Sequence, residues 1–199
     1  MFKKHTPSPR LLVVPGLNDS GPVHWQTWLA SLHRDAVRVV QDDWLEPDLD
    51  RWAGRVAETL EDHGGGGDWL VAAHSFGCLA LARHLKLRPD LPVAAALLVA
   101  PADPRKFGVL DLLPTRSLPC HSVLVGSQND PWMSATQAKE WADRWGSHWV
   151  NLGDAGHINA ESGFGPWPYA QRWVVANQQR WARQQRPVRA AFSEWTFAV

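Results

Sequence analysis

The chain has 199 residues, and its 20 Lys and Arg side chains balance its 20 Asp and Glu side chains, so its formal net charge at pH 7 is zero. A neutral chain without a basic block lacks the phosphate contacts that supply most nucleic-acid affinity, and no apolar run approaches the ~18 residues of a membrane span. We therefore expect neither nucleic acid nor a membrane as a partner. Its two cysteines do not make a disulfide framework, so we expect a reduced, cytoplasmic location.

The unusual feature of the composition is tryptophan, with 13 residues against a single tyrosine. A large aromatic side chain is costly to leave in water, and a chain of this length buries roughly 70% of its unfolded surface. One domain is therefore expected over residues 10–185. Residues 1–9 carry basic side chains but no long apolar core, so they are interpreted as a tail rather than a signal peptide, and residues 186–199 as a second tail.

Short apolar runs alternate along the chain with stretches of helical periodicity. The runs predict strands over residues 11–14, 37–40, 69–73, 93–100, 122–126 and 149–152. Helices are predicted over residues 25–33, 76–87, 134–145 and 166–185, and another begins after a cap at Asp48 and ends at the four glycines 64–67.

These strands lack polar–apolar alternation and are separated by helices, a pattern that indicates a parallel sheet buried on both faces. The expected fold is α/β, a three-layer α/β/α sandwich around a mostly parallel six-stranded sheet. The segment between Ala100 and Cys120 is short and broken by prolines, so no large cap is expected there. Sites in such sheets form at the carboxyl ends of the strands, which makes the residues after each strand the informative ones.

Ser75 follows the third predicted strand and opens a predicted helix, within Ala73-His74-Ser75-Phe76-Gly77. A sharp strand–turn–helix connection presents a serine hydroxyl as a nucleophile, and small residues flank it because strand and helix cross closely. Ala73 and Gly77 are small, although glycine is commoner at the first position. The helix N-terminus adds free N–H groups and partial positive charge. By itself, such a string also occurs where a serine merely caps a helix.

An acidic and a basic partner for Ser75 follow later strands. Asp130 comes after the fifth predicted strand and His157 after the sixth. The chain order Ser, Asp, His is the order of the α/β-hydrolase elbow. We therefore expect Ser75 to attack a carbonyl carbon, His157 to take its proton, and Asp130 to hold the imidazole and stabilise its cation. Asp103, after the fourth strand, is the alternative acid, whereas Asp154 is too close to His157 in the loop to reach its outer nitrogen.

A developing oxyanion needs two preorganised N–H donors. One is expected to be the amide of Phe76, directly after the nucleophile. The other is expected to be the amide of Leu17, since Gly16 lets the loop after the first strand turn in closely. Asn18, in the same loop, is expected to contact the substrate. Alone, this segment rich in Gly, Asn and Asp would be an ordinary turn.

Several segments in combination resemble one family, and they are Val14-Pro15-Gly16-Leu17-Asn18-Asp19-Ser20-Gly21-Pro22 with His24-Trp25-Gln26, Gln41-Asp42-Asp43-Trp44, Ala73-His74-Ser75-Phe76-Gly77 and Gly156-His157-Ile158-Asn159. They are similar to the small serine hydrolases of the YdeN and retinoblastoma-binding-protein-9-like family, over roughly residues 10 to 183. The resemblance implies a compact α/β-hydrolase core, no cofactor, and a triad of Ser75, Asp130 and His157. It implies a chemistry more than a substrate, and no protein-binding role is carried over from the family's name.

Three tryptophans that follow predicted strands are expected to wall the substrate pocket, namely Trp44, Trp132 and Trp167. Others lie on the apolar stripes of helices and are expected in the core, namely Trp28, Trp52, Trp141 and Trp173. This division assigns most of the unusual tryptophan content to packing and a few residues to the site.

Neither His24 nor His74 belongs to a cluster with metal-ligand spacing, so no metal is expected. His24 is interpreted as a structural polar residue near the oxyanion loop, and His74 as a residue that makes a local hydrogen bond. Cys78 is interpreted as a small core residue of the elbow helix rather than a second nucleophile.

The sequence therefore predicts a serine hydrolase that works through an acyl-enzyme, with a carboxylesterase acting on small or short-chain esters as the leading interpretation. An amidase or peptidase with the same triad is one alternative, and a non-catalytic binding protein on a hydrolase scaffold is another. A scaffold that only binds need not keep all three triad residues. We expect a small ester or amide as substrate, no cofactor, and a monomer or weak homodimer.

Overall fold

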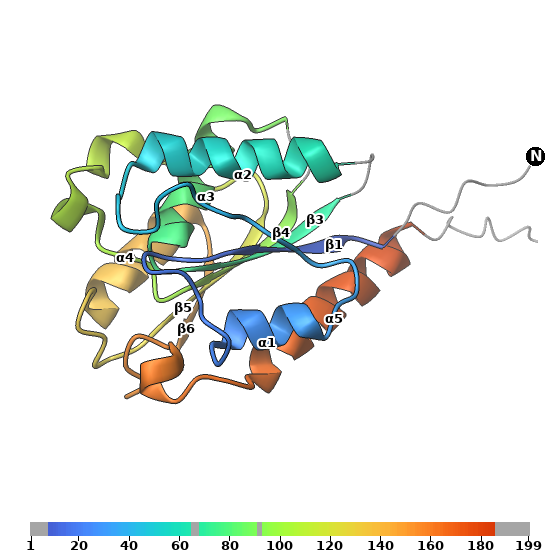
Figure 1. Ribbon diagram of the computed structural model, residues 1–199. Coiled ribbons are helices and arrows are strands. Elements are labelled where there is room, and N and C mark those ends of the chain that lie inside the picture. The colour runs from blue at the N-terminus through green and yellow to red at the C-terminus, as the bar shows by residue number, and fades with distance from the viewer. Residues whose placement is uncertain (1–7, 65–67, 91–92, 186–199) are drawn as a thin grey trace, which may run out of the picture.

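The computed structural model describes residues 8–64, 68–90 and 93–185 of the chain (Figure 1). The predicted tail over residues 186–199, most of the predicted tail over residues 1–9 and three of the four glycines at 64–67 lie outside the described residues. Within the described ranges, a central sheet is enclosed between helices.

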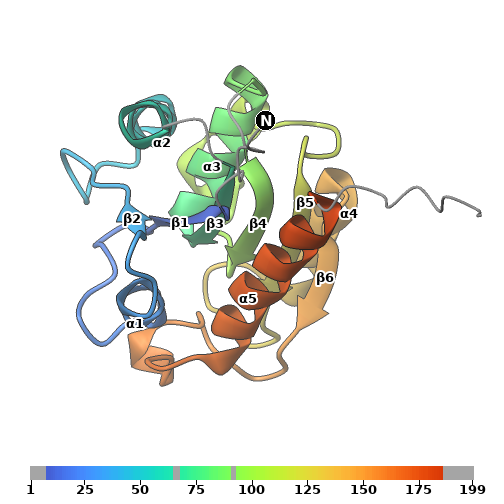
Figure 2. The same ribbon diagram turned by 90° about the vertical axis from the view of Figure 1, so that its right-hand side faces the viewer.

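Six strands form one sheet in the order β2-β1-β3-β4-β5-β6, and every neighbouring pair is parallel (Figure 2). The strands are β1 (Arg10–Val14), β2 (Val37–Arg38), β3 (Trp69–His74), β4 (Val93–Val99), β5 (His121–Gly126) and β6 (His148–Asn151). The carboxyl ends of β1 and β3 lie level, with Val14, the last residue of β1, opposite Ala73, the last but one of β3. The loops that leave these two strands therefore start side by side at one edge of the sheet.

Helices cover both faces of the sheet (Figure 1). One face carries α1 (Trp25–Ser31) and α5 (Pro168–Gln184), and the other carries α2 (Leu49–His63), α3 (Phe76–Leu87) and α4 (Ala135–Trp145). Successive strand residues alternate between the two cores, so that Leu12 packs toward α2 and α3 while Leu11 packs toward α1 and α5. The predicted three-layer α/β/α fold with a parallel six-stranded sheet is confirmed.

Local capping signals set several helix ends. The Asp48 side chain accepts the N–H of Arg51 at the start of α2, as predicted. Ser134 and Gln137 form a reciprocal capping box at the start of α4. Gly146 ends the same helix with a φ of 65°, the left-handed conformation that glycine adopts without a steric penalty.

Several elements are shorter than their sequence patterns suggested, including the helix predicted over residues 166–185, which spans Pro168–Gln184. The predicted strand over residues 37–40 pairs only over Val37–Arg38, and the predicted helix over residues 25–33 ends at Ser31. Leu32, which lies inside the predicted helix range, caps the helix end and is 44% exposed. The last turn of a predicted helix is the part that local periodicity determines least.

Tryptophan contributes to both cores. Trp52 and Trp141 are buried beneath the helices on the α2–α4 side, and Trp173 is buried on the α5 side, as predicted. Trp28 is only partly buried and packs at the margin of the core. These indoles fill the space between helices and sheet, and their burial supplies a large apolar area per residue.

The connection between β4 and β5 folds into two short 3-10 helices, η1 (Pro104–Phe107) and η2 (Leu110–Leu112), and forms no large cap. This agrees with the expectation from its length and prolines. No helix within residues 8–64, 68–90 and 93–185 is both long enough and apolar enough to cross a membrane.

His84 is a buried group that makes stability depend on pH. It is 1% exposed on α3, and neither of its ring nitrogens has a hydrogen-bond partner among the described residues. Burial lowers the pKa of His84 from 6.5 to about 4, and the charge of Arg88 acts in the same direction. Between pH 6.5 and 4, His84 binds a proton in the unfolded chain but stays neutral in the folded chain. This side chain therefore destabilises the folded state as pH falls from 6.5 toward 4.

Replacing His84 by leucine removes this pH-dependent contribution. We expect the wild-type protein to lose roughly 2–3 kcal/mol more free energy of unfolding than His84→Leu between about pH 7.5 and about pH 4.5, from 1.36 kcal/mol per pKa unit. Urea unfolding of both proteins at the two pH values measures the difference. An equal loss of stability in both proteins contradicts a neutral, buried His84.

Candidate active site

Ser75 lies at the turn between β3 and α3, at the carboxyl edge of the sheet. Its backbone has a φ of 52° and a ψ of −124°, a conformation that costs a non-glycine residue roughly 1–3 kcal/mol. Its side chain makes no capping hydrogen bond to the helix that follows, and it borders a cavity at the ends of the strands. The hydroxyl is therefore presented to the cavity rather than used as a helix cap.

Two glycines allow backbone segments to approach this turn. A Cβ on Gly77 would lie only 2.3 Å from the carbonyl oxygen of Pro15 and 2.5 Å from that of Val14. A Cβ on Gly16 would lie 2.7 Å from the Cβ of Ser75. The start of α3 thus rests directly on the end of β1, and the loop after β1 passes immediately beside the serine.

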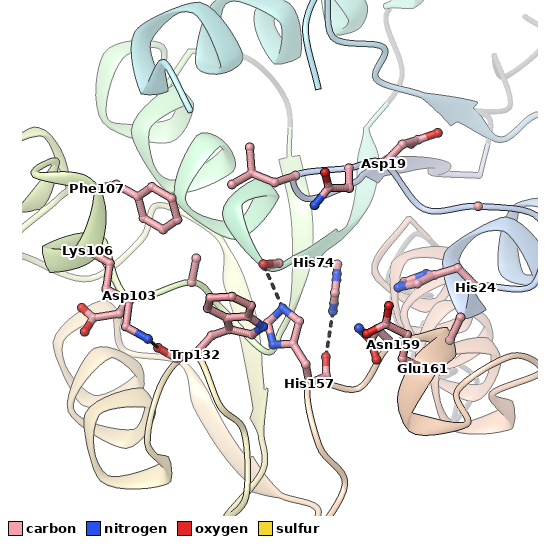
Figure 3. Close-up of a pocket in the computed structure, with 16 residues that line it drawn as sticks. Asp19, His24, His74, Asp103, Lys106, Phe107, Trp132, His157, Asn159 and Glu161 are labelled. Carbon is pink, nitrogen blue, oxygen red and sulfur yellow. Dashed lines mark hydrogen bonds between the residues drawn. The ribbon is translucent and has the colours of Figure 1, made fainter. Parts of the chain in front are cut away.

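His157, in the loop after β6, lies between the serine and an aspartate. Its Nε2 is 3.0 Å from Ser75 Oγ (Figure 3), and its Nδ1 is 2.9 and 3.1 Å from the two carboxylate oxygens of Asp130. Because a carboxylate only accepts, Nδ1 carries the proton and Nε2 is left to accept from the serine hydroxyl. The Asp130 side chain is 3% exposed and also accepts the backbone N–H of Trp132 at 2.9 Å. The three residues form one continuous hydrogen-bonded chain.

The two other aspartates considered as acids occupy different places. Asp103 caps η1 by accepting the N–H of Arg105 at 3.0 Å, and it lines the cavity. Asp154 is exposed on the loop before His157. In the described part of the chain, neither side chain hydrogen bonds to His157, so the geometry favours Asp130 as the partner of the imidazole.

The backbone amides of Phe76 and Leu17 donate no hydrogen bond to any residue that the structure describes. The N–H of Phe76 lies in the first turn of α3, where a helix has no internal acceptor for it. Leu17 follows Gly16 and lines the cavity beside the serine. Asn18 also lines the cavity, and its own N–H donates to the carbonyl oxygen of Trp44 at 3.0 Å, which holds the loop in place.

Two further histidines pack in a row with His157. The ring centroids of His24 and His74 are 4.8 Å apart, and those of His74 and His157 are 4.9 Å apart. His74 Nε2–H donates to the carbonyl oxygen of His157 at 3.0 Å, while His24 Nδ1 accepts the N–H of Gln26 at 3.1 Å.

Both of these additional histidines are neutral groups. Burial lowers the pKa of His74 well below its ordinary value, and burial lowers that of His24 to about 4. Neither ring therefore places a positive charge beside His157 at pH 7. The contacts of His24 agree with the structural role predicted for it. His74 makes a hydrogen bond, but to a residue 83 positions along the chain rather than to a local partner.

The cavity around Ser75 has a volume of about 440 Å³ and two unlike ends. Phe107, Trp132 and Lys106 lie on one side of the serine, and His24 and Asn159 lie on the other (Figure 3). Lys106 Nζ donates to the carbonyl oxygen of Trp132 at 2.7 Å and lies 5.3 Å from the centre of its ring. The side with Phe107 and Trp132 offers aromatic surface, whereas the opposite side offers polar atoms.

Of the tryptophans predicted to wall the pocket, Trp132 lines the cavity and is 54% exposed. Trp44 and Trp167 do not line it. Trp44 packs edge-on against Trp52 with ring centroids 5.8 Å apart, and Trp167 packs edge-on against Trp25 at 5.2 Å. Both indoles turn into the helix layers, because a place near the carboxyl edge does not determine where a side chain points.

Several residues of the cavity were not predicted from the sequence. Lys106 and Phe107 come from η1, and Asn159 and Glu161 come from η3 (Ala160–Ser162) and its cap. Asn159 carried a usable signal, because it closes the segment that begins at Gly156 and contributes to the family resemblance. Lys106 and Phe107 belong to no motif, and only the path of the chain between β4 and β5 turns them toward the serine.

Residues 8–64, 68–90 and 93–185 contain no group of three or more His, Cys, Asp or Glu side chains arranged to hold a metal ion. Cys78 lies fully buried on α3, and burial raises the pKa of its thiol. Its Sγ donates to the carbonyl oxygen of Val99. A buried, neutral thiol is unreactive, which agrees with the predicted core role.

Comparison with known proteins places the chain among hydrolases. The family model described as serine hydrolase matches residues 11–195. A YdeN-like hydrolase from Pectobacterium atrosepticum shares 35% sequence identity over 87% of this chain and 92% of its own, with a TM-score of 0.81. No curated protein sequence matches the chain significantly.

More distant solved structures share the fold. The ydeN gene product of B. subtilis is 19% identical over 86% of this chain and 100% of its own, with a TM-score of 0.72. The esterase RhEst1 from Rhodococcus sp. is 16% identical over 89% of this chain and 92% of its own, with a TM-score of 0.62. At these identities the likeness concerns the arrangement of helices and strands.

Gly77→Ala tests the close approach of α3 to β1. The added methyl group would meet backbone oxygen atoms that cannot rotate away, so we expect a loss of about 1–3 kcal/mol in the free energy of unfolding. Gly54→Ala is the matched control, because an added methyl there meets no atom within 4 Å in the middle of α2. That control is expected to be neutral or to stabilise by up to about 1 kcal/mol. Urea unfolding measures both, and equal effects contradict the close contact.

Proposed function

The chain belongs to the serine hydrolase family, and we propose that it is a carboxylesterase that cleaves small or short-chain esters through an acyl-enzyme on Ser75. The observation that carries this proposal is the hydrogen-bonded chain from Ser75 through His157 to Asp130, which ends inside a cavity. A serine hydroxyl is a weak nucleophile until an adjacent base takes its proton, and this arrangement supplies that base.

In the proposed reaction, Ser75 Oγ attacks the ester carbonyl carbon while His157 Nε2 takes the hydroxyl proton. The carbonyl oxygen becomes an oxyanion that the free amides of Leu17 and Phe76 stabilise, helped by the N-terminus of α3. His157 then gives its proton to the departing alkoxide, and the C–O bond of the ester breaks. Water, activated in turn by His157, hydrolyses the acyl-enzyme and releases the acid. Asp130 holds the imidazole and stabilises its cation throughout.

The small size of the proposed substrate rests on the cavity. A volume of about 440 Å³ lies toward the lower end of the ~300–1,000 Å³ range of small-molecule sites. The aromatic side with Phe107 and Trp132 suits a short acyl chain, and the polar side with Asn159 suits the remaining part of the ester. At the cavity wall the carboxylates of Asp103 and Glu161 outnumber the ammonium group of Lys106, and this excess of negative charge disfavours an anionic substrate.

A fluorophosphonate reagent tests the nucleophile. We expect the native protein to be labelled and Ser75→Ala not to be labelled, because the reagent forms a covalent bond only with an activated serine. Ser31→Ala, at an exposed serine of α1, is the control and is expected to be labelled as fast as the native protein. Absence of labelling in the native protein contradicts a serine hydrolase mechanism.

The same proteins decide between ester and amide chemistry. Hydrolysis of p-nitrophenyl esters is expected to fall as the acyl chain outgrows the cavity, and p-nitroanilides with the same acyl groups are expected to react more slowly. Faster cleavage of the anilides would replace the carboxylesterase by an amidase. If the native protein is labelled but hydrolyses neither the p-nitrophenyl esters nor the p-nitroanilides, it is a binding scaffold with a reactive serine and not a carboxylesterase.

The acid of the proposed triad is tested by two asparagine substitutions. Asp130→Asn no longer holds His157 in the required tautomer, so we expect kcat to fall by about 10⁴, the loss that the same change causes in a serine protease triad. Asp103→Asn removes a wall carboxylate without touching His157, so its kcat is expected to stay within about tenfold of the native value. Ester hydrolysis under saturating substrate measures both. The reverse order of effects assigns the acid to Asp103.

A further inference from the structure

Trp25 and Gln26 are consecutive residues of α1 that are fully buried, with 0% of either residue exposed. Neither lines the cavity, and neither has a place in the proposed reaction. A buried glutamine is unusual, because its amide has to find hydrogen-bond partners away from water. The partners of these two side chains are the loops that carry the proposed catalytic groups.

Gln26 joins the ends of two neighbouring strands. Its Nε2 donates to the carbonyl oxygens of Val14 and Ala72, each at 3.0 Å, and its Oε1 accepts from Ser20 Oγ at 2.6 Å. Both N–H bonds of the amide and its oxygen are therefore used. One side chain binds the end of β1, the end of β3 and the far side of the loop after β1.

These contacts bracket the two proposed oxyanion donors. Leu17 comes three residues after Val14, and Phe76 comes four residues after Ala72. The oxyanion hole works only when both amides lie close to the position of the charged oxygen, and errors of about 1 Å are costly. A side chain that fixes β1 and β3 to each other close to these donors also fixes the separation of the donors.

Trp25 holds the loop that carries the histidine. Its indole Nε1–H donates to the carbonyl oxygen of Ile158 at 3.0 Å, and its ring packs edge-on against His74 with centroids 6.2 Å apart. Ile158 follows His157 directly and has a φ of 49°, an unfavourable conformation for a β-branched residue. A buried donor aimed at its carbonyl oxygen stabilises that conformation and with it the direction of the His157 side chain.

We propose that Trp25 and Gln26 are positioning residues, with Gln26 setting the separation of the oxyanion donors of Leu17 and Phe76 and Trp25 setting the orientation of His157. The inference rests on the proposed function, since it assigns these side chains to the same reaction. A merely structural role would stabilise the fold without a selective effect on kcat or on the titration of the histidine. The two roles are therefore separable by kinetics.

For Gln26, the test compares Gln26→Met with the matched control Gln178→Met. Gln178 Nε2 donates to the carbonyl oxygen of Pro9 at 3.3 Å, at the opposite end of the strands, so the control loses a similar side-chain hydrogen bond away from the site. We expect Gln26→Met to lower kcat for ester hydrolysis by about 10- to 100-fold with KM within about threefold, and Gln178→Met to leave both unchanged. Ser20→Ala, which removes one donor to Gln26, is the milder second variant and is expected to show a smaller fall in kcat.

For Trp25, the test compares Trp25→Phe with Trp181→Phe. Trp181 Nε1–H donates to Asp68 Oδ2 at 2.6 Å, so this control also loses an indole hydrogen bond while keeping an aromatic ring. We expect Trp25→Phe to shift the acid limb of the pH profile of kcat/KM and the downfield NMR signal of the His157 Nδ1 proton. Trp181→Phe is expected to shift neither, and Gln26→Met is expected to leave the pH profile in place.

The outcomes separate this inference from the proposed function. Two outcomes overturn the positioning roles while the native enzyme still hydrolyses esters. One is a fall in kcat no larger than the fall in the fraction of the variant that is folded, and the other is the same fall in kcat in a variant and in its control. If the native protein neither reacts with the fluorophosphonate nor hydrolyses esters, the proposed function fails. The NMR signal then still tests Trp25, and a signal unchanged in Trp25→Phe overturns its role.

Discussion

The contact between the start of α3 and the end of β1 is the constraint on which the rest of the site depends. Because Gly77 has no side chain, the first turn of the helix rests on the carbonyl oxygens of Val14 and Pro15. That approach leaves room for only a sharp turn at Ser75, whose backbone takes a left-handed φ of 52°. The same crowding brings Gly16 against the serine. A loop and a helix N-terminus, each with a free amide, thereby meet at one hydroxyl, which is the arrangement that acyl transfer requires.

Buried polar groups make this arrangement rigid. His157 uses both ring nitrogens and its carbonyl oxygen, and Gln26 uses every polar atom of its side chain. In a low dielectric each such bond is strong, and leaving one unmade is costly, so the network has few alternative geometries. The neutral rings of His24 and His74 fill the remaining space without adding charge beside the imidazole. Hydrogen bonds between buried polar groups and the packing of buried rings therefore hold the same loops, those after β1 and β6, in place.

Much of the fold and the core of the candidate site could be predicted from local patterns. The helix over residues 76–87 has the predicted bounds, because an almost entirely apolar run between a turn and a break leaves little choice. The proximity of Ser75, Asp130 and His157 could be predicted from the sequence, since the carboxyl ends of parallel strands lie at one edge of the sheet. Weak ends were less predictable, as Leu32 shows, because the last turn of a helix lacks the hydrogen bonds that define its middle.

The sequence by itself determined the layers, the parallel sheet and the residue types at the strand ends, because periodicity, caps and glycine positions act over a few residues. Only the tertiary structure decided that Asp130 rather than Asp103 reaches the imidazole. It also turned Trp44 into the core while leaving Trp132 at the cavity, and it carried Gln26 to the ends of two strands. Such choices depend on side-chain direction and on distances between segments far apart in the chain, which local patterns do not encode.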